Sequence, residues 1–306
     1  MPDRPLISVV VFVLNAADTV ERALSSVTSA DQPPIELLVM DGGSMDGTVD
    51  VIRRHESEIA HWRSRKDGSA TIALNEGVQR ATGDVICLLP ADDWIEPGAL
   101  HRVQHAFAAD PALEVLSCGT RFVHVNSADS IEVDAEFLDP EILEFSMENI
   151  VRCPLTAGRF VLRRLYNELG FYNPDDLMSN DLDFLIRLLL RRPRASVLQD
   201  LVYTYRKHPG SRTLGGNPQM ILEMMRGNLK VAERHLPEHR LAPRERRALL
   251  GLHGRSSARL AWMLAERGDV VRAARVLRDA VAANPLLPIQ VPVWLAQKWL
   301  RRDRIS

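Results

Sequence analysis

The amino-acid sequence predicts an α/β fold with a mostly parallel central sheet flanked by helices, followed by a C-terminal α-helical extension. Between Leu6 and Leu89, short runs of Val, Ile and Leu alternate with segments of helical periodicity. This alternation is typical of parallel α/β sheets. Polar residues follow the ends of several apolar runs, where ligands bind in such sheets. From Pro218 onward the periodicity is helical, which predicts the extension.

The first predicted strand is Leu6 to Leu14, whose continuous apolar run suits a strand buried on both faces. A helix is expected to start at Asp18, a capping residue followed three positions later by an acid. The remaining elements of this region, in chain order, are a strand at Ile35–Met40, a helix at Thr48–His55, a strand at Ala60–Arg63, a helix at Ser69–Arg80 and a strand at Asp84–Leu89.

The segment from Glu114 to Tyr205 has a mixed pattern. The polar stretch Asn126–Glu136 is typical of a loop or hairpin. Helical periodicity indicates helices at Val161–Leu169 and Asp181–Leu190, and the run Leu201–Tyr205 indicates a strand.

We expect two domains, residues 1–213 and a basic helical extension at residues 214–306. The extension has 17 Lys and Arg against 8 Asp and Glu, a net charge of +9, which leaves −11 for the rest because the whole chain carries −2. Within it, Ala258–Pro285 predicts two helices joined at Arg267-Gly-Asp269, without the second copy that a solenoid requires. The stretch 288–302 combines Trp and Val with Lys and Arg, so it suits a membrane surface or a helix packed on the protein.

Bulk properties narrow the class of protein. The net charge of −2 predicts no nucleic-acid partner. Three scattered cysteines, Cys87, Cys118 and Cys153, argue against a disulfide framework and favour the cytoplasm. The N-terminal apolar run lacks a cleavage pattern, and no stretch is long enough to span a bilayer, so membrane contact would be peripheral at the inner face. Motifs of P-loop, dinucleotide, zinc-protease and serine-hydrolase sites are missing.

Two segments carry a family resemblance. Ile35–Thr48 contains Asp-Gly-Gly-Ser-Met-Asp-Gly-Thr, and Ala81–Trp94 ends in Pro-Ala-Asp-Asp-Trp. With the strand Ser8–Asn15, they resemble family 2 glycosyltransferases of the GT-A fold, in particular bacterial exopolysaccharide and O-antigen transferases. The resemblance resumes at Gly158–Arg187 and at Tyr205–Ser211. It implies inverting transfer of a sugar from a nucleoside-diphosphate sugar to a hydroxyl of a sugar or lipid-linked sugar acceptor.

The resemblance implies a nucleotide site built from Asn15, Asp41, Asp67, Asn75 and Asp92. Asp41 matches the position that reads the base, although an Asp before Gly is also a common turn former. Asp67, before Gly68, could equally be an exposed turn residue. Asp46 is expected to cap the following helix.

The Asp92-Asp93 pair resembles the family's metal-binding motif, which implies Mg²⁺ or Mn²⁺ on hard oxygen ligands. The alternative is a pair of acids capping the helix after Pro97. His208 matches a loop position that approaches the metal or diphosphate in some relatives, and Arg206 is a candidate for binding the diphosphate.

Asp181, in Ser179–Arg187, matches the Asp that removes the acceptor proton, with helix N-capping as the plain alternative. Among the candidate site positions, the chain departs from the family where Pro90 and Asn180 replace acids and where Leu74 replaces a common Arg. These departures leave a nucleotide-sugar-binding protein without turnover as an alternative. A second is that the helical tail is the main functional part, serving interaction or membrane docking.

Overall fold

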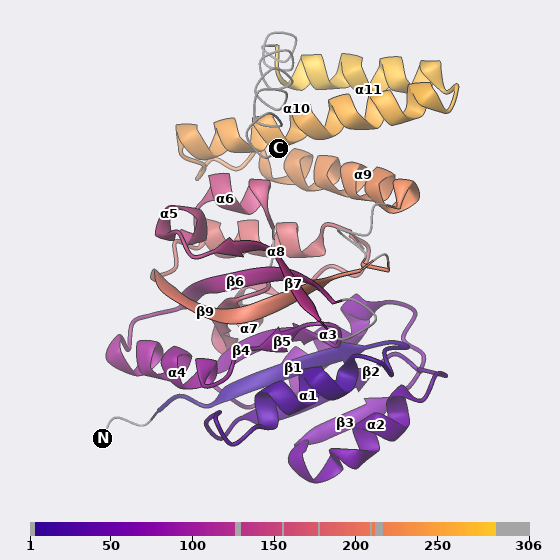
Figure 1. The fold of residues 1–306 in the computed structure, drawn as a ribbon. Helices are drawn as coiled ribbons and strands as arrows, with labels where there is room; N and C mark the ends of the chain where they lie inside the picture. Colours follow the sequence, from indigo (N-terminus) through magenta and orange to yellow (C-terminus); the bar gives the residue numbers. More distant parts are fainter. Residues whose placement is uncertain are drawn as a thin grey trace. The chain divides into compact units, whose positions relative to one another are not determined.

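The computed structural model describes residues 4–125, 130–154, 156–176, 178–208, 210–211 and 217–285 (Figure 1). The chain divides into two compact units, residues 1–215 and 216–306. A sheet with flanking helices forms the first unit, and helices form the second.

The first unit is built on a nine-stranded sheet in the order β3-β2-β1-β4-β8-β6-β9-β5, with β7 paired to β6. The strands β1 to β4 pair in parallel, and so do β6 and β9. The antiparallel pairings involve β8, β7 and β5. Their bounds are β1 (Ile7–Val13), β2 (Glu36–Asp41), β3 (His61–Ser64), β4 (Val85–Pro90), β5 (Trp94–Ile95), β6 (Val115–Val125), β7 (Ile131–Phe137), β8 (Arg159–Leu162) and β9 (Ala195–Lys207).

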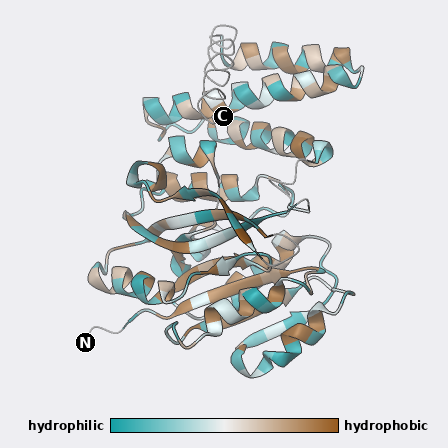
Figure 2. Cartoon of the chain, in the orientation of Figure 1, coloured by the Kyte–Doolittle hydropathy of each residue, from teal (hydrophilic) through white to brown (hydrophobic). Residues whose placement is uncertain are grey.

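Helices cover the apolar strands, which are brown in Figure 2. Val9 and Val11 of β1 belong to the core that α1 and α4 complete, whereas Val10 lies against α3. There Gly77 permits the close approach, because a Cβ at that position would lie 2.3 Å from Val10 Cγ1. The helices are α1 (Val20–Thr28), α2 (Thr48–Arg54), α3 (Ala70–Arg80), α4 (Ala99–Ala109), α5 (Pro140–Leu143), α6 (Met147–Arg152), α7 (Arg163–Leu169) and α8 (Asn180–Leu190).

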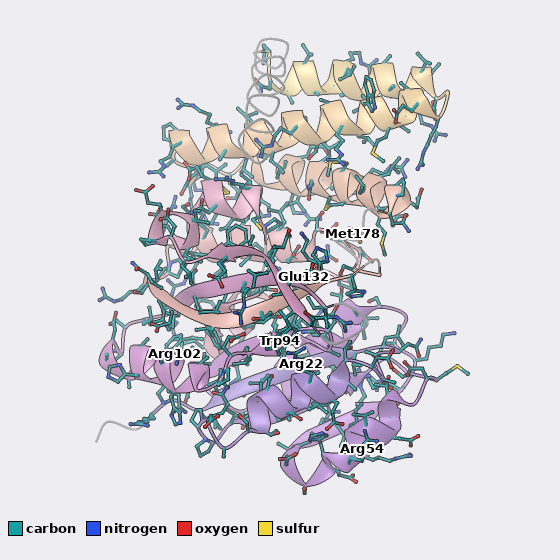
Figure 3. All side chains as sticks on the ribbon, in the orientation of Figure 1. Arg22, Arg54, Trp94, Arg102, Glu132 and Met178 are labelled. Carbon is teal, nitrogen blue, oxygen red and sulfur yellow. The ribbon has the colours of Figure 1, made fainter. Side chains whose placement is uncertain are left out.

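Helix α1 is tied to the segment that follows β4. The Arg22 guanidinium lies over the Trp94 ring, 3.8 Å from its centroid (Figure 3). Ser26 Oγ accepts a hydrogen bond from Ile95 N at 3.2 Å. Because Trp94 directly follows the two predicted metal ligands, these contacts hold the backbone that carries them.

Two predicted elements differ in the structure. The helix expected at Val161–Leu169 begins only at Arg163, because Arg159–Leu162 forms β8 between β4 and β6. Asp18 does not cap α1, whose N-cap residue is Thr19 with no side-chain cap. Beyond residues 126–129, which lie outside the described part, the polar stretch forms β7 and pairs antiparallel with β6.

The second unit contains α9 (Pro218–His235), α10 (Pro243–Glu266) and α11 (Val270–Ala283), which confirms the helical extension. Its small core joins Leu222 and Met225 of α9 to Leu260 and Leu264 of α10 and Ala273 of α11. The predicted stretch 288–302 lies outside the described residues. No helix among those described has the length and apolarity to cross a membrane.

Candidate active site

The parallel strands bring most of the predicted polar residues to one edge of the sheet. Asn15 follows β1, Asp41 ends β2, and Asp92 and Asp93 follow β4. Since β1 pairs with both β2 and β4, the carboxyl ends of these strands are neighbours. This edge is the usual ligand-binding edge of a parallel sheet.

Asp41 braces the turn that follows β2. Its Oδ2 accepts hydrogen bonds from the backbone N–H groups of Gly43 and Ser44, at 3.0 and 2.9 Å, and from Ser64 Oγ at 2.5 Å, and its Oδ1 accepts from Ser44 Oγ. The residue is 0% exposed. The predicted contact between Asp41 and a base would therefore require this turn to open, whereas the turn-forming alternative fits the observed geometry.

Asn15 lies at the rim of the same turn. Its Oδ1 accepts a hydrogen bond from Met45 N at 2.9 Å, and its own N–H donates to Ser44 Oγ at 2.7 Å. Its φ of 49° is a left-handed conformation that Asn tolerates. Asp46 accepts bonds from Thr48 N and Thr48 Oγ1 at the start of α2, but the N-cap residue of this helix is Gly47, so Asp46 does not occupy the expected capping position.

Asp67 and Asn75 are both held by protein groups. Asp67 pairs with Arg63 at 2.8 Å, and its side chain is only 3% exposed, which does not fit the alternative of an exposed turn residue. The amide of Asn75 donates to Tyr172 O at 2.7 Å and accepts from Tyr172 N at 3.0 Å. Asn75 therefore fastens α3 to the segment before α8, and its amide is engaged in that contact.

Asp93 is buried beneath the edge of the sheet. It is 1% exposed, and its two carboxylate oxygens accept hydrogen bonds from Tyr203 Oη at 2.6 Å and from Arg206 N at 2.9 Å. Burial, and then the charge of Asp92, raise the pKa of Asp93 well above its usual value. We expected both acids to face a metal ion. In the structure, Asp93 instead positions β9 through its hydrogen bonds with Tyr203 and Arg206.

Asp92, in contrast, remains accessible and meets His208. His208 Nε2 lies 2.9 Å from Asp92 Oδ2, and the two side chains are 34% and 31% exposed. Between them in the chain, Arg206 has a buried Nε with no hydrogen-bond partner among the described residues. An unsatisfied buried donor is costly, so this guanidinium suits a site completed by an acceptor from a ligand.

Asp181 lies in the first turn of α8. Its Oδ1 accepts a hydrogen bond from Leu182 N at 2.8 Å, and the N-cap residue of the helix is Ser179, so the capping alternative does not apply to Asp181 itself. Asn180 donates to Thr71 Oγ1 of α3 at 2.7 Å, which anchors the start of α8. Asp183 pairs instead with Arg187 at 2.8 Å within the helix.

Sequence reasoning missed two residues that the structure links to these acids. Tyr203 satisfies Asp93, and the charge of Asp181 acts on the buried guanidinium of Arg159. Arg159 belongs to a segment that carries the family resemblance and Tyr203 lies just before another, but nothing in their spacing shows what they contact. Their partners are 110 and 22 residues away in the chain.

The described residues contain no cluster of three or more His, Cys, Asp or Glu side chains arranged to bind a metal ion. Asp92 and His208 are a pair of oxygen and nitrogen donors with accessible side chains. A hard divalent ion accepts the carboxylate oxygen and commonly completes its coordination with substrate phosphates, whereas imidazole nitrogen is a usual ligand of transition metals. The residues present are therefore compatible with a metal shared between protein and substrate.

Comparison with known proteins gives concordant matches. The family model described as glycosyl transferase family 2 matches residues 8–169, more than half of the chain. AglE of Haloferax volcanii is 25% identical over 57% of this chain and 58% of its own length. EpsJ of Bacillus subtilis, described as an uncharacterized glycosyltransferase, is 22% identical over 68% of this chain and 63% of its own length. The chain thus spans less than two thirds of both relatives.

Solved structures share the fold at low identity. Residues 1–349 of S. aureus TarS in complex with UDP-GlcNAc superpose with a TM-score of 0.57 and 16% identity, over 89% of this chain and 90% of that one. The mannosyltransferase PcManGT of Pyrobaculum calidifontis, in complex with GDP-Man and Mn²⁺, gives a TM-score of 0.59 and 20% identity, over 96% of this chain and 81% of that one. The expected GT-A fold is thereby confirmed, and the chain belongs to glycosyl transferase family 2.

Proposed function

We propose that this protein transfers a sugar from a nucleoside-diphosphate sugar to an acceptor hydroxyl with inversion, in the synthesis of a surface or exopolysaccharide. The observation that carries the proposal is the accessible Asp92–His208 pair, 2.9 Å apart, with the unsatisfied Nε of Arg206 close by in the chain. Together they suit an anionic diphosphate and its counter-ion at the ligand-binding edge of the sheet.

Asp92 and His208 would hold Mg²⁺ or Mn²⁺, which when bound offsets the negative charge of the departing diphosphate. Arg206 would bind a phosphate oxygen through its guanidinium. Asp93 would not touch the metal in this arrangement. It would position Arg206, whose backbone N–H it accepts at 2.9 Å, and Tyr203, whose hydroxyl it accepts at 2.6 Å.

Asp181 would accept the proton of the acceptor hydroxyl as that oxygen attacks the anomeric carbon. A single displacement forms the new bond from acceptor oxygen to carbon while the bond to the diphosphate oxygen breaks, which inverts the configuration. Support comes from the position of Asp181 in the first turn of an anchored helix. The nucleotide would lie on the turn that Asp41 braces, near Asn15, with Asp67 and Asn75 shaping the site through Arg63 and Tyr172.

A donor panel tests the transferase proposal against the alternative of binding without turnover. Purified protein with Mn²⁺ is expected to bind at least one of UDP-, GDP- or dTDP-linked sugars and to release the nucleoside diphosphate, measured by coupled assay. Tight binding without nucleotide release, in the presence of candidate acceptors, would support the alternative that Pro90, Leu74 and Asn180 suggest. Failure to bind any of these donors would contradict both.

We also propose that residues 214–306 form a separate basic domain that brings the catalytic domain, residues 1–213, to the inner face of the membrane, where a lipid-linked acceptor would be reached. Support comes from the net charge of +9 and from exposed Trp262 (67%) and Val271 (73%) beside exposed arginines of α11. The whole chain is expected to sediment with vesicles containing anionic lipid, and residues 1–213 are not. If the whole chain and residues 1–213 were recovered in the supernatant to the same extent, the result would contradict this proposal.

A further inference from the structure

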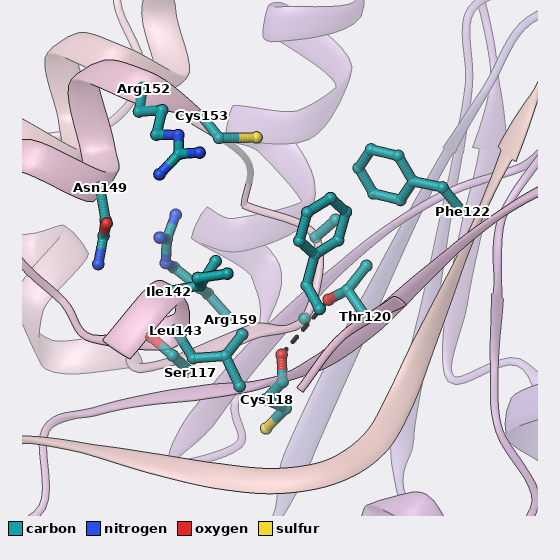
Figure 4. Close-up of a pocket in the computed structure, with 13 residues that line it drawn as sticks. Ser117, Cys118, Thr120, Phe122, Ile142, Leu143, Asn149, Arg152, Cys153 and Arg159 are labelled. Atoms are coloured by element: carbon teal, nitrogen blue, oxygen red, sulfur yellow. Dashed lines mark hydrogen bonds between the residues drawn. The ribbon is translucent and has the colours of Figure 1, made fainter. Parts of the chain in front are cut away.

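A cavity of about 110 Å³ in the first unit has no part in the donor chemistry described above (Figure 4). It lies between β6, β7, α5 and α6 and the segment that begins β8. A single water needs about 10–15 Å³ on the same scale, so this cavity admits a ring-sized group. Apolar side chains form most of its wall, namely those of Cys118, Phe122, Phe137, Ile142, Leu143 and Ala157.

Two guanidinium groups converge in this mostly apolar cavity. Arg152 comes from the last turn of α6 and Arg159 from the first position of β8, and Figure 4 shows them pointing toward one another. No carboxylate among the described residues forms an ion pair with Arg152. Two cations that face each other repel, so the arrangement favours an anion between them.

Arg159 is held in place and stays charged. Its guanidinium lies over the ring of Phe145, 5.6 Å from the centroid. Burial lowers the pKa of Arg159 to about 10, and the charges of Cys153 and Asp181 act in the opposite direction. A pKa near 10 leaves the group cationic at neutral pH.

The cavity lies beside the groups proposed for transfer. Arg159 is within electrostatic range of Asp181, the proposed base. At the other end, the ring of Phe122 packs against that of Tyr205, with centroids 5.0 Å apart. The β6–β9 pairing sets Phe122 opposite Tyr205 and Val123 opposite Arg206, so this side of the cavity adjoins the strand that leads to His208. The wall of the cavity thus includes Arg159, on which the charge of Asp181 acts, and Phe122, which lies beside the strand that carries Arg206.

We propose that this cavity is an acceptor subsite for a sugar that carries an anionic group, either a carboxylate or a phosphate ester. Arg152 and Arg159 would bind the anion, and Phe122 and Phe137 would contact the apolar face of the sugar ring. This inference rests on the proposed transferase function, because it assigns the acceptor of that reaction.

The test measures binding of three probes to the whole chain by calorimetry: methyl glucuronide, glucose 1-phosphate and the neutral methyl glucoside. At least one anionic probe is expected to bind at least about tenfold more tightly than the neutral one. Tighter binding of methyl glucuronide identifies a carboxylate acceptor, and tighter binding of glucose 1-phosphate a phosphate acceptor. Equal affinities, or no binding of either anionic probe at millimolar concentration, overturn the proposal.

Variants locate the effect. Arg152→Gln and Arg159→Gln are expected to remove most of the preference for the anionic probe, while Arg159→Lys retains part of it. Arg53→Gln, at an exposed arginine of α2, is the matched control and should keep the preference. Because Arg159 is largely enclosed, thermal unfolding checks each variant, and the exposed Arg152 provides a test that does not depend on core packing. A preference that survives Arg152→Gln and Arg159→Gln in folded protein overturns the assignment.

Nucleoside-diphosphate affinity, measured on the same samples, separates the two proposals. If the unmodified chain binds no nucleotide with Mn²⁺, the transferase proposal fails. If it binds nucleotide but shows no preference for anionic probes, only the acceptor assignment fails.

Discussion

Replacing Asp181 by Asn is expected to lower kcat for sugar transfer by about 10²–10⁴-fold, the usual contribution of a general base. The substitution keeps the size of the side chain and leaves an oxygen that can still accept from Leu182 N at the start of α8. It removes only the capacity to take up the acceptor proton. Donor affinity should therefore change little, and the loss should appear in kcat. Steady-state kinetics with the donor found in the panel, together with calorimetry of donor binding, measure both quantities.

Asp175→Asn is the matched control for this experiment. Asp175 is exposed in the segment before α8 and should retain normal kinetics when substituted. A kcat for Asp181→Asn within about threefold of the unmodified protein would remove Asp181 from the role of base. The nearby Asp183 would not be a substitute candidate, because it is 3% exposed and paired with Arg187.

Replacing Asp92 by Asn, or His208 by Ala, is expected to weaken Mn²⁺-dependent binding of the donor nucleotide by about 100-fold or more, because each change removes one of the two proposed protein ligands to the ion. Affinity measured in EDTA should be similar for the variants and the unmodified chain. The readout is calorimetric titration of nucleoside diphosphate with and without Mn²⁺. Unchanged metal dependence in either variant would contradict its assignment as a ligand.

Two further variants serve as controls for the metal prediction. His101→Ala changes an exposed histidine on α4 and should preserve metal-dependent binding. Asp93→Ala tests the distinction between the two neighbouring acids. It leaves Tyr203 Oη and Arg206 N without their buried acceptor, so we expect the free energy of unfolding to fall by about 2–4 kcal/mol in urea denaturation. Normal stability together with lost metal dependence would return Asp93 to the role of ligand.

Much of the catalytic unit's fold could be predicted from local patterns. The strands β1, β2 and β4 are continuous apolar runs, because both of their faces are buried under helices. The same reasoning gave the wrong result for Arg159–Leu162, where a helix was predicted from Val161 onward and the structure has the strand β8. Its four residues form a strand only because β4 and β6 lie on either side to accept its backbone hydrogen bonds, and those strands are distant in the chain. The hydrophobic periodicity of a short segment contains no information about strands that are distant in the chain and pair with it.

The site divides along similar lines. The resemblance to the family's motifs indicated Asp92, Asp181, Arg206 and His208, and the structure brings Asp92 and His208 together across 116 residues. The same motifs assigned both Asp92 and Asp93 to the metal, since both are acids after one strand. The structure makes them different, because Tyr203 lies over one and solvent reaches the other.

By itself, the sequence determined the family, the α/β alternation and the kind of chemistry, since strand burial and motif composition are local properties of the chain. The tertiary structure decided which of the predicted polar atoms are accessible. The carboxylate of Asp41 is shielded from solvent by its own turn and by Ser64. The carboxylate of Asp93 is shielded by Tyr203 of β9. Accessibility depends on which distant segments pack together, and the cavity bounded by Arg152 and Arg159 exists only because β6, α6 and β8 converge.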